Sequence, residues 1–148
     1  MMRKILAVVL CIFACLAATG FRSEASLHQQ VDLDLTLLDN EAVHAQIFQM
    51  LVAPEEYTGK TVRMQGNFTP YQAPQESPIL NPGQHYLSCV ITDEHNCCSQ
   101  GIDFHLAEGG HQQTPYPAAG SQITVVGKFQ LVEVNGYSYT YVADARLE

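Results

Sequence analysis

Two segments of the chain repeat one pattern of glycine and apolar residues, G-x-x-Φ-x-Φ-x-G-x-F, where Φ is apolar. The first copy runs from Gly59 to Phe68 and the second from Gly120 to Phe129. Alternation with a period of two is typical of a strand with one buried face, and a glycine inside a strand marks a bulge or a sharp bend. We expect Gly66 and Gly127 at equivalent bulges, as a small closed sheet requires.

Three further segments carry strand patterns, which brings the predicted total to five. The hairpin signal Asn135-Gly136 should join the last two strands, because both residues tolerate positive φ. With five strands, the economical closed sheet is an OB-like barrel. The predicted fold class is therefore mainly β, a small five-stranded OB-like barrel with one N-terminal helix. The predicted strands cover residues 60–68, 86–92, 101–106, 122–132 and 137–142.

The predicted helix covers residues 39–52. Its apolar residues recur at helical spacing, either Asp39 or Asn40 can cap its start, and Pro54 ends it. We expect the helix to pack on the core through Val43, Ile47 and Leu51, with His44 on its polar side.

The N-terminus has the pattern of a secretory signal peptide over residues 1–25: a basic start, a short apolar run and small residues before Ser26. Ala14-Cys15 offers a second option, cleavage and lipidation at Cys15 as in bacterial lipoproteins. Either route places the mature protein outside the cytoplasmic membrane, and only a lipid on Cys15 would anchor it there. Residues 26–38 are predicted as an extended lead-in, and residues 39–148 as the barrel domain with its helix.

The chain from Ser26 onward is strongly acidic, with 4 basic and 14 acidic residues and a net charge of −10 with neutral histidines. Nucleic acid requires clustered Lys and Arg, so the composition predicts that nucleic acid is not a partner. An anionic membrane surface is disfavoured for the same reason. Cations remain compatible with this charge.

Three cysteines remain in the exported form: Cys89, Cys97 and Cys98. Adjacent cysteines cannot bridge each other without strain. Together with Asp93 and His95, Cys97 and Cys98 form a candidate metal site, and thiolate ligands favour soft ions such as zinc or copper(I). Zinc is the one cofactor that we consider. If the strands on either side of these residues form a hairpin, Cys89 in the first strand should lie opposite the far end of the second strand, near His105. The alternatives are a structural role for the cysteines and a redox or nucleophilic thiol.

A family resemblance rests on the frame Tyr57-x-Gly59-Lys60-x-Val62 with Gly66, followed by Cys89, Asp93, Cys97-Cys98 and the run from Gly101 to Phe104. In these residues the chain resembles uncharacterised exported proteins of anaerobic Firmicutes. More distantly, it is similar to the OB-like extracytoplasmic domain of a bacterial permease subunit that context links to zinc supply. The resemblance covers roughly residues 32–147, and it implies an OB-like fold and a metal role. The permease's membrane segments are missing from this chain, so transport is not implied.

The sequence contains none of the common hydrolase, metalloprotease, nucleotide-binding or dinucleotide-binding motifs. We therefore expect a non-enzymatic extracytoplasmic binding or accessory protein, with a soft metal ion as a candidate ligand and a membrane protein or another envelope component as a candidate partner. A thiol-dependent redox protein or enzyme is one alternative. Another is a protein- or sugar-binding module that uses the hairpin tyrosines Tyr137, Tyr139 and Tyr141, unless the lead-in covers them.

Overall fold

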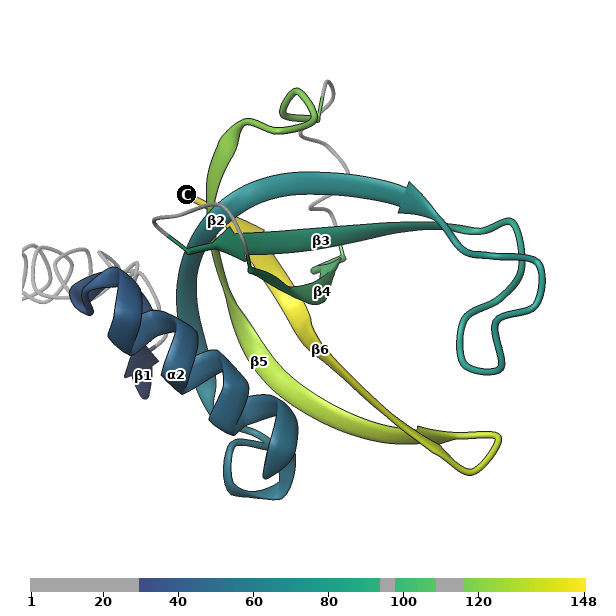
Figure 1. The fold of residues 1–148 in the computed structure, drawn as a ribbon, viewed down its shortest axis with the longest axis horizontal. Helices are drawn as coiled ribbons and strands as arrows, with labels where there is room; N and C mark the ends of the chain where they lie inside the picture. The colour runs from purple at the N-terminus through teal and green to yellow at the C-terminus, as the bar shows by residue number, and fades with distance from the viewer. Residues whose placement is uncertain (1–29, 94–97, 109–115) are drawn as a thin grey trace, which may run out of the picture.

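The computed structural model describes residues 30–93, 98–108 and 116–148, and the predicted signal peptide lies outside them (Figure 1). One α-helix and six strands make up most of this described part, and none of its helices is long and apolar enough to cross a membrane. The elements are β1 (Leu33–Asp34), η1 (Leu35–Leu37), α2 (Asn40–Val52), η2 (Pro54–Glu56), β2 (Thr61–Gln72), β3 (His85–Thr92), β4 (Ser99–Leu106), β5 (Gln122–Val134) and β6 (Tyr137–Leu147).

The six strands form one mixed sheet in the order β1-β2-β3-β4-β6-β5. β2 also pairs with β5, so β2, β3, β4, β6 and β5 close into a ring, around which the long strands β2 and β5 curve (Figure 1). β1 adds to β2 in parallel, β4 and β6 are parallel, and the other pairs are antiparallel. The prediction of a mainly β fold with one helix is confirmed for the described part of the chain.

The two copies of the glycine pattern form neighbouring strands of this ring. β2 and β5 run antiparallel, with Gly66 opposite Ile123. The next residue, Asn67, pairs both with β5 and with Val90 of β3, so β2 changes partner directly after its glycine. A Cβ atom at Gly66 would lie 2.7 Å from the carbonyl oxygen of Val90 and 2.8 Å from the Sγ atom of Cys89. The close approach of β3 therefore requires a glycine at this position.

The bulge that we expected at Gly127 of β5 lies instead on its neighbour β6. The pairing of β6 with both β4 and β5 shifts at one place, where Asp144 has a φ of +50°. Because a bulge inserts one residue into the alternation, Val142 and Ala145 are both fully buried although they are three positions apart. Gly127 accommodates this bulge, since a Cβ atom there would lie 2.6 Å from the carbonyl oxygen of Ala143.

Helix α2 begins after Asp39, whose carboxylate accepts a hydrogen bond of 2.9 Å from a main-chain N–H of the first turn. Ile47 and Met50 are fully buried, and Val43 packs against the same core. Leu51 is 38% exposed, so our prediction that it faces the core is wrong. Met50 takes that position, because a residue three places after Ile47 lies on the same helix face.

The core fills the inside of the ring with aromatic and branched side chains. Its largest fully buried members include Phe68, Phe104 and Phe129, one each from β2, β4 and β5. Alternation sends the neighbours of these residues to the outer surface of the ring. On β4, Phe104 is buried whereas Asp103 and His105, on either side of it, reach the outer surface. That outer surface carries the candidate site.

Candidate binding face and pocket

The predicted metal site lies at the turn between β3 and β4, where the hairpin is confirmed with Thr92 opposite Ser99. The main-chain N–H of Asp93 donates a hydrogen bond of 3.0 Å to the carbonyl oxygen of Cys98, which closes the turn, and Cys98 is exposed. Residues 94–97, and with them His95 and Cys97, lie outside the described residues. Within the described ranges, no group of three His, Cys, Asp or Glu residues could hold a metal ion.

Cys89 lies apart from this turn, inside the core. It is opposite Ile102 rather than near His105, so the expected position along the hairpin is wrong by several residues. Burial raises the pKa of the Cys89 thiol to about 12. The thiol is therefore protonated at neutral pH and unsuited to act as a nucleophile or a metal ligand.

A second group of candidate side chains lies on the outer side of the ring, where five aromatic rings from four strands meet. We call this group the tyrosine–histidine face; its members are Tyr71 of β2, Tyr86 of β3, His105 of β4, and Tyr139 and Tyr141 of β6. Successive ring centroids, in the order Tyr71, Tyr86, His105, Tyr141 and Tyr139, are 5.8, 6.4, 4.5 and 5.5 Å apart.

Strand register brings these rings together. Tyr71 is directly opposite Tyr86 in the antiparallel pair β2–β3. In the parallel pair β4–β6, Tyr141 is opposite Asp103, and His105 lies two residues further along β4 on the same face. Tyr139 precedes Tyr141 by two residues and shares that face. The pair β3–β4, with Ser88 opposite Asp103, connects the two halves. The tyrosine–histidine face therefore depends on three separate strand pairings.

Asp103 joins the two ends of the ring series. The hydroxyl groups of Tyr71 and Tyr139 donate hydrogen bonds of 2.6 and 2.8 Å to the same atom, Oδ2 of Asp103. The pKa values of both phenols lie well above the ordinary value, mainly because of burial and also because the Asp103 carboxylate disfavours a second negative charge beside it. Both hydrogen bonds go to Oδ2, which leaves Oδ1 as the acceptor for a further donor.

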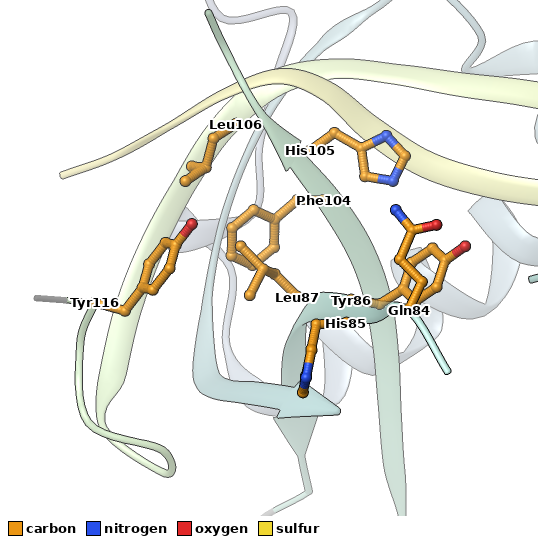
Figure 2. A pocket seen from close by; sticks show the side chains of 8 residues that line it. All are labelled: Gln84, His85, Tyr86, Leu87, Phe104, His105, Leu106 and Tyr116. Carbon is orange, nitrogen blue, oxygen red and sulfur yellow. The ribbon is translucent and has the colours of Figure 1, made fainter. Parts of the chain in front are cut away.

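A pocket opens at the edge of the face, where β3 and β4 separate. Their pairing ends at Ser88 opposite Asp103, so the start of β3 and the end of β4 diverge. The gap has a volume of about 340 Å³ and is drawn in Figure 2. Its apolar walls come from Leu87, Phe104 and Leu106, and Tyr116 stands across from them.

Polar groups lie on the other side of the pocket. His105 and Gln84 point toward one another at its rim, next to Tyr86 (Figure 2). His105 and Tyr86 belong both to the pocket lining and to the tyrosine–histidine face. The pocket therefore adjoins the tyrosine–histidine face at Tyr86 and His105, and its apolar walls belong to the inner side of the sheet.

Two connections lie at the same end of the ring and extend beyond it: the loop between β2 and β3, and the turn between β5 and β6 (Figure 1). They are joined by a hydrogen bond of 2.8 Å from the Asn135 side chain to the carbonyl oxygen of Pro78. The main-chain N–H of Asn81, in the first loop, donates to the Tyr86 hydroxyl at 3.0 Å. This loop therefore fixes one ring of the face in position.

The lysine and arginine side chains of the described part take no part in this site. Arg63 and Arg146 both form ion pairs with Glu148, at 3.0 and 3.3 Å. Lys60 precedes β2 and Lys128 is exposed on β5. None of the four lines the pocket or bonds to Asp103.

Sequence reasoning found only part of this surface. The alternation of hairpin tyrosines predicted that Tyr139 and Tyr141 share a face, and they are stacked. Tyr137 is 54% exposed and takes no part in the ring contacts. The described part of the lead-in adds β1 to the edge of β2, at Val62 and Arg63. Tyr71, Tyr86, His105 and Asp103 were missed, because only the strand register reveals that they meet.

Comparisons with known proteins add one distant structure. No model of a protein family and no curated protein matches the chain. A crystal structure from Klebsiella pneumoniae subsp. pneumoniae MGH 78578, described as a "putative nucleic acid-binding lipoprotein", is similar at 19% identity and a TM-score of 0.47, covering 73% of this chain and 87% of that chain.

The description of the Klebsiella protein contradicts our prediction that nucleic acid is not a partner, and we withdraw that prediction. Its physical basis was the net charge of the chain. Net charge sums all residues and does not describe any one face, and aromatic rings can hold single-stranded bases by stacking.

Proposed function

We propose that this protein is a non-enzymatic extracytoplasmic binding module, whose closed ring is an OB-like barrel. The strand order supports the second part of this proposal. When the ring strands are numbered 1 to 5 in chain order from β2, their order around the ring is 1-2-3-5-4, and strand 4 pairs with strand 1. This is a Greek-key order. OB-folds bind ligands on the face of their second and third strands, between the loop after the first strand and the loop before the fifth. In this chain, β3 and β4 occupy those positions.

The observation that carries the proposal is the tyrosine–histidine face with its adjoining pocket. Five rings, one carboxylate and an apolar pocket of about 340 Å³ lie together on β2, β3, β4 and β6. Ligand sites in proteins combine apolar and aromatic walls with a few polar groups, at volumes from about 300 Å³ upward. Tyrosine, which combines an apolar ring with a polar tip, is also enriched at protein interfaces.

Tyrosine fluorescence provides a direct test, because the chain has seven tyrosines and no tryptophan. The purified protein is titrated with a chitin trisaccharide, benzyltrimethylammonium and a short oligothymidylate. We expect at least one probe to change the emission of the wild type and of Tyr137→Leu. Tyr141→Leu should bind that probe about tenfold more weakly, as expected for loss of one stacking ring.

The matched pair of tyrosine variants decides the result. Tyr141 contacts His105 and Tyr139, whereas Tyr137 on the same strand has no ring contact in the described structure. Equal binding by both variants, or no response to any probe, would contradict a binding role for the face.

A second candidate function is soft-metal binding at the β3–β4 turn. The observation that favours it is the exposed Cys98 thiol beside the hydrogen bond that closes the turn at Asp93. We expect Cys97→Ser and Cys98→Ser each to weaken zinc binding sharply, because a hydroxyl replaces a thiolate poorly, and His95→Ala to weaken it less. Cys89→Ser should affect stability and leave affinity unchanged. A protein that binds neither zinc nor copper(I) at micromolar concentration would end this candidate.

A further inference from the structure

The tyrosine–histidine face and its pocket have a definite electrostatic character. Asp103 is the carboxylate that joins the two ends of the ring series, and the phenols of Tyr71 and Tyr139 that donate hydrogen bonds to it are neutral at neutral pH, as phenols ordinarily are. No Lys or Arg side chain of the described residues bonds to Asp103 or lines the pocket, and the imidazole-bearing residues that do line it are His85 and His105. The faces of aromatic rings carry negative electrostatic potential. The surface is therefore complementary to positive charge.

We propose that this surface binds an organic ammonium ion, with the cationic head between Asp103 and the neighbouring rings and an apolar ring or chain in the pocket between β3 and β4. The proposal rests on the proposed binding function and names the class of its ligand. Ammonium groups of this kind are attracted by ring faces within about 6 Å and by a nearby carboxylate.

The spacing within the site fits a ligand with a charged end and an apolar end. Asp103 and His105 lie two residues apart on one face of β4, a separation of about 7 Å. His105 in turn lines the pocket, whose apolar walls are Leu87, Phe104 and Leu106. A ligand that places its ammonium head at Oδ1 of Asp103 reaches this apolar lining by passing His105 and entering the gap between β3 and β4.

The hydrogen bonds of the site favour a cation over a neutral sugar. A sugar requires several donors and acceptors around each ring, yet the hydroxyls of Tyr71 and Tyr139 are both engaged with Oδ2 of Asp103. The Tyr86 hydroxyl accepts from the main chain of the β2–β3 loop. An ammonium head needs only charge and ring faces, and the half-buried rings of Tyr71, Tyr139 and Tyr141 lie beside the Asp103 carboxylate.

Isothermal titration with three small probes tests the proposal: benzyltrimethylammonium, its neutral analogue benzyl alcohol, and tetramethylammonium, which lacks the ring. We expect benzyltrimethylammonium to bind at least about tenfold more tightly than either of the others, because only this probe uses both the charge and the pocket. Ionic strength is held constant throughout, since exposed charges are screened by salt.

Two charge-neutralising variants locate the effect. Asp103→Asn keeps an acceptor for the tyrosine hydroxyls and removes the charge, and we expect it to weaken benzyltrimethylammonium binding about tenfold or more. Glu133→Gln is the matched control. Glu133 is exposed on β5 opposite Ser138, which alternates with Tyr139, so it lies on the other face of the hairpin. Its affinity should stay within about twofold of the wild type, as for a screened surface charge.

Thermal melting of both variants shows whether each is folded, and Tyr141→Leu supplies a second test if Asp103→Asn is not. Equal binding of benzyl alcohol and benzyltrimethylammonium, or an unchanged affinity in folded Asp103→Asn, would overturn the ammonium proposal.

If the chitin trisaccharide or the oligothymidylate binds in a Tyr141-dependent way and benzyltrimethylammonium does not, the face binds a ligand of another class. In that case the proposed function stands and this inference fails. If no probe binds, both fail.

Discussion

The two ends of the β3–β4 hairpin differ in how their functional groups are brought together. At the turn, Asp93 and Cys98 are close in sequence, and one main-chain hydrogen bond closes the connection. At the open end, β3 and β4 separate beyond the pair Ser88–Asp103. Side chains from β2 and β6 join those of β3 and β4 there. A cluster at the turn can be recognised in the sequence as a motif, whereas the surface at the open end exists only in the folded ring.

The largest expected effect is a loss of stability when the core that supports the open end is truncated. Phe104→Ala removes a fully buried ring that also lines the pocket, and we expect a loss of about 3–5 kcal/mol in the free energy of unfolding. Urea denaturation measures the loss. A cost below about 1 kcal/mol would show that the open end is not supported by the core.

The hydrogen bonds to Asp103 should give the next largest effect. Tyr139→Phe removes one of the two hydroxyl donors to the carboxylate and should cost about 1.5–3 kcal/mol, as for a hydrogen bond to a charged group. Tyr137→Phe is the control on the same strand and should be nearly neutral. Equal melting temperatures for the two variants would mean that the convergence of tyrosines on Asp103 does not stabilise the fold.

Alkaline pH should destabilise the folded ring. In the unfolded chain the Cys89 thiol ionises near pH 9.0 and the phenols near pH 10.0, whereas the folded state raises the pKa values of Cys89, Tyr71 and Tyr139. The folded protein therefore retains protons that the unfolded chain releases, so stability is complete below about pH 9 and falls as pH rises toward 12.

Urea midpoints at about pH 8 and about pH 10.5 measure this fall. Tyr139→Phe removes one of the three groups and should make the dependence on pH shallower. A midpoint that is equal at both pH values would contradict the burial of these groups.

The smallest effect is expected at the turn end. The hydroxyls of Thr92 and Ser99 are 3.2 Å apart in an exposed pair, so Ser99→Ala should change the free energy of unfolding by no more than about 0.5 kcal/mol. A cost comparable with that of Tyr139→Phe would remove the contrast between the two ends.

Local sequence patterns predicted much of the fold. Alternation located all five strands of the ring, and the Asn135-Gly136 signal is confirmed, because both residues have positive φ. The end of β6 was predicted too early, because the bulge at Asp144 interrupts the alternation there. Leu51 was predicted to face the core in place of Met50, because the two residues are adjacent and both apolar, and the sequence pattern alone does not separate them.

The candidate site was largely beyond prediction for a physical reason. The pairing of Tyr71 with Tyr86 and of Asp103 with Tyr141 depends on register across strands far apart in the chain. A shift of one residue in either pair would send these side chains to the opposite face. The sequence instead directed attention to the vicinal cysteines, where the chemistry is evident without knowledge of the register.

The most direct test asks which end of the hairpin binds the ligand. Benzyltrimethylammonium is titrated into Asp103→Asn and Cys98→Ser, with tyrosine emission as the readout. Our account predicts that Asp103→Asn weakens binding about tenfold or more and that Cys98→Ser binds as the wild type does. Weakened binding in Cys98→Ser with unchanged binding in Asp103→Asn would place the site at the turn and contradict the account.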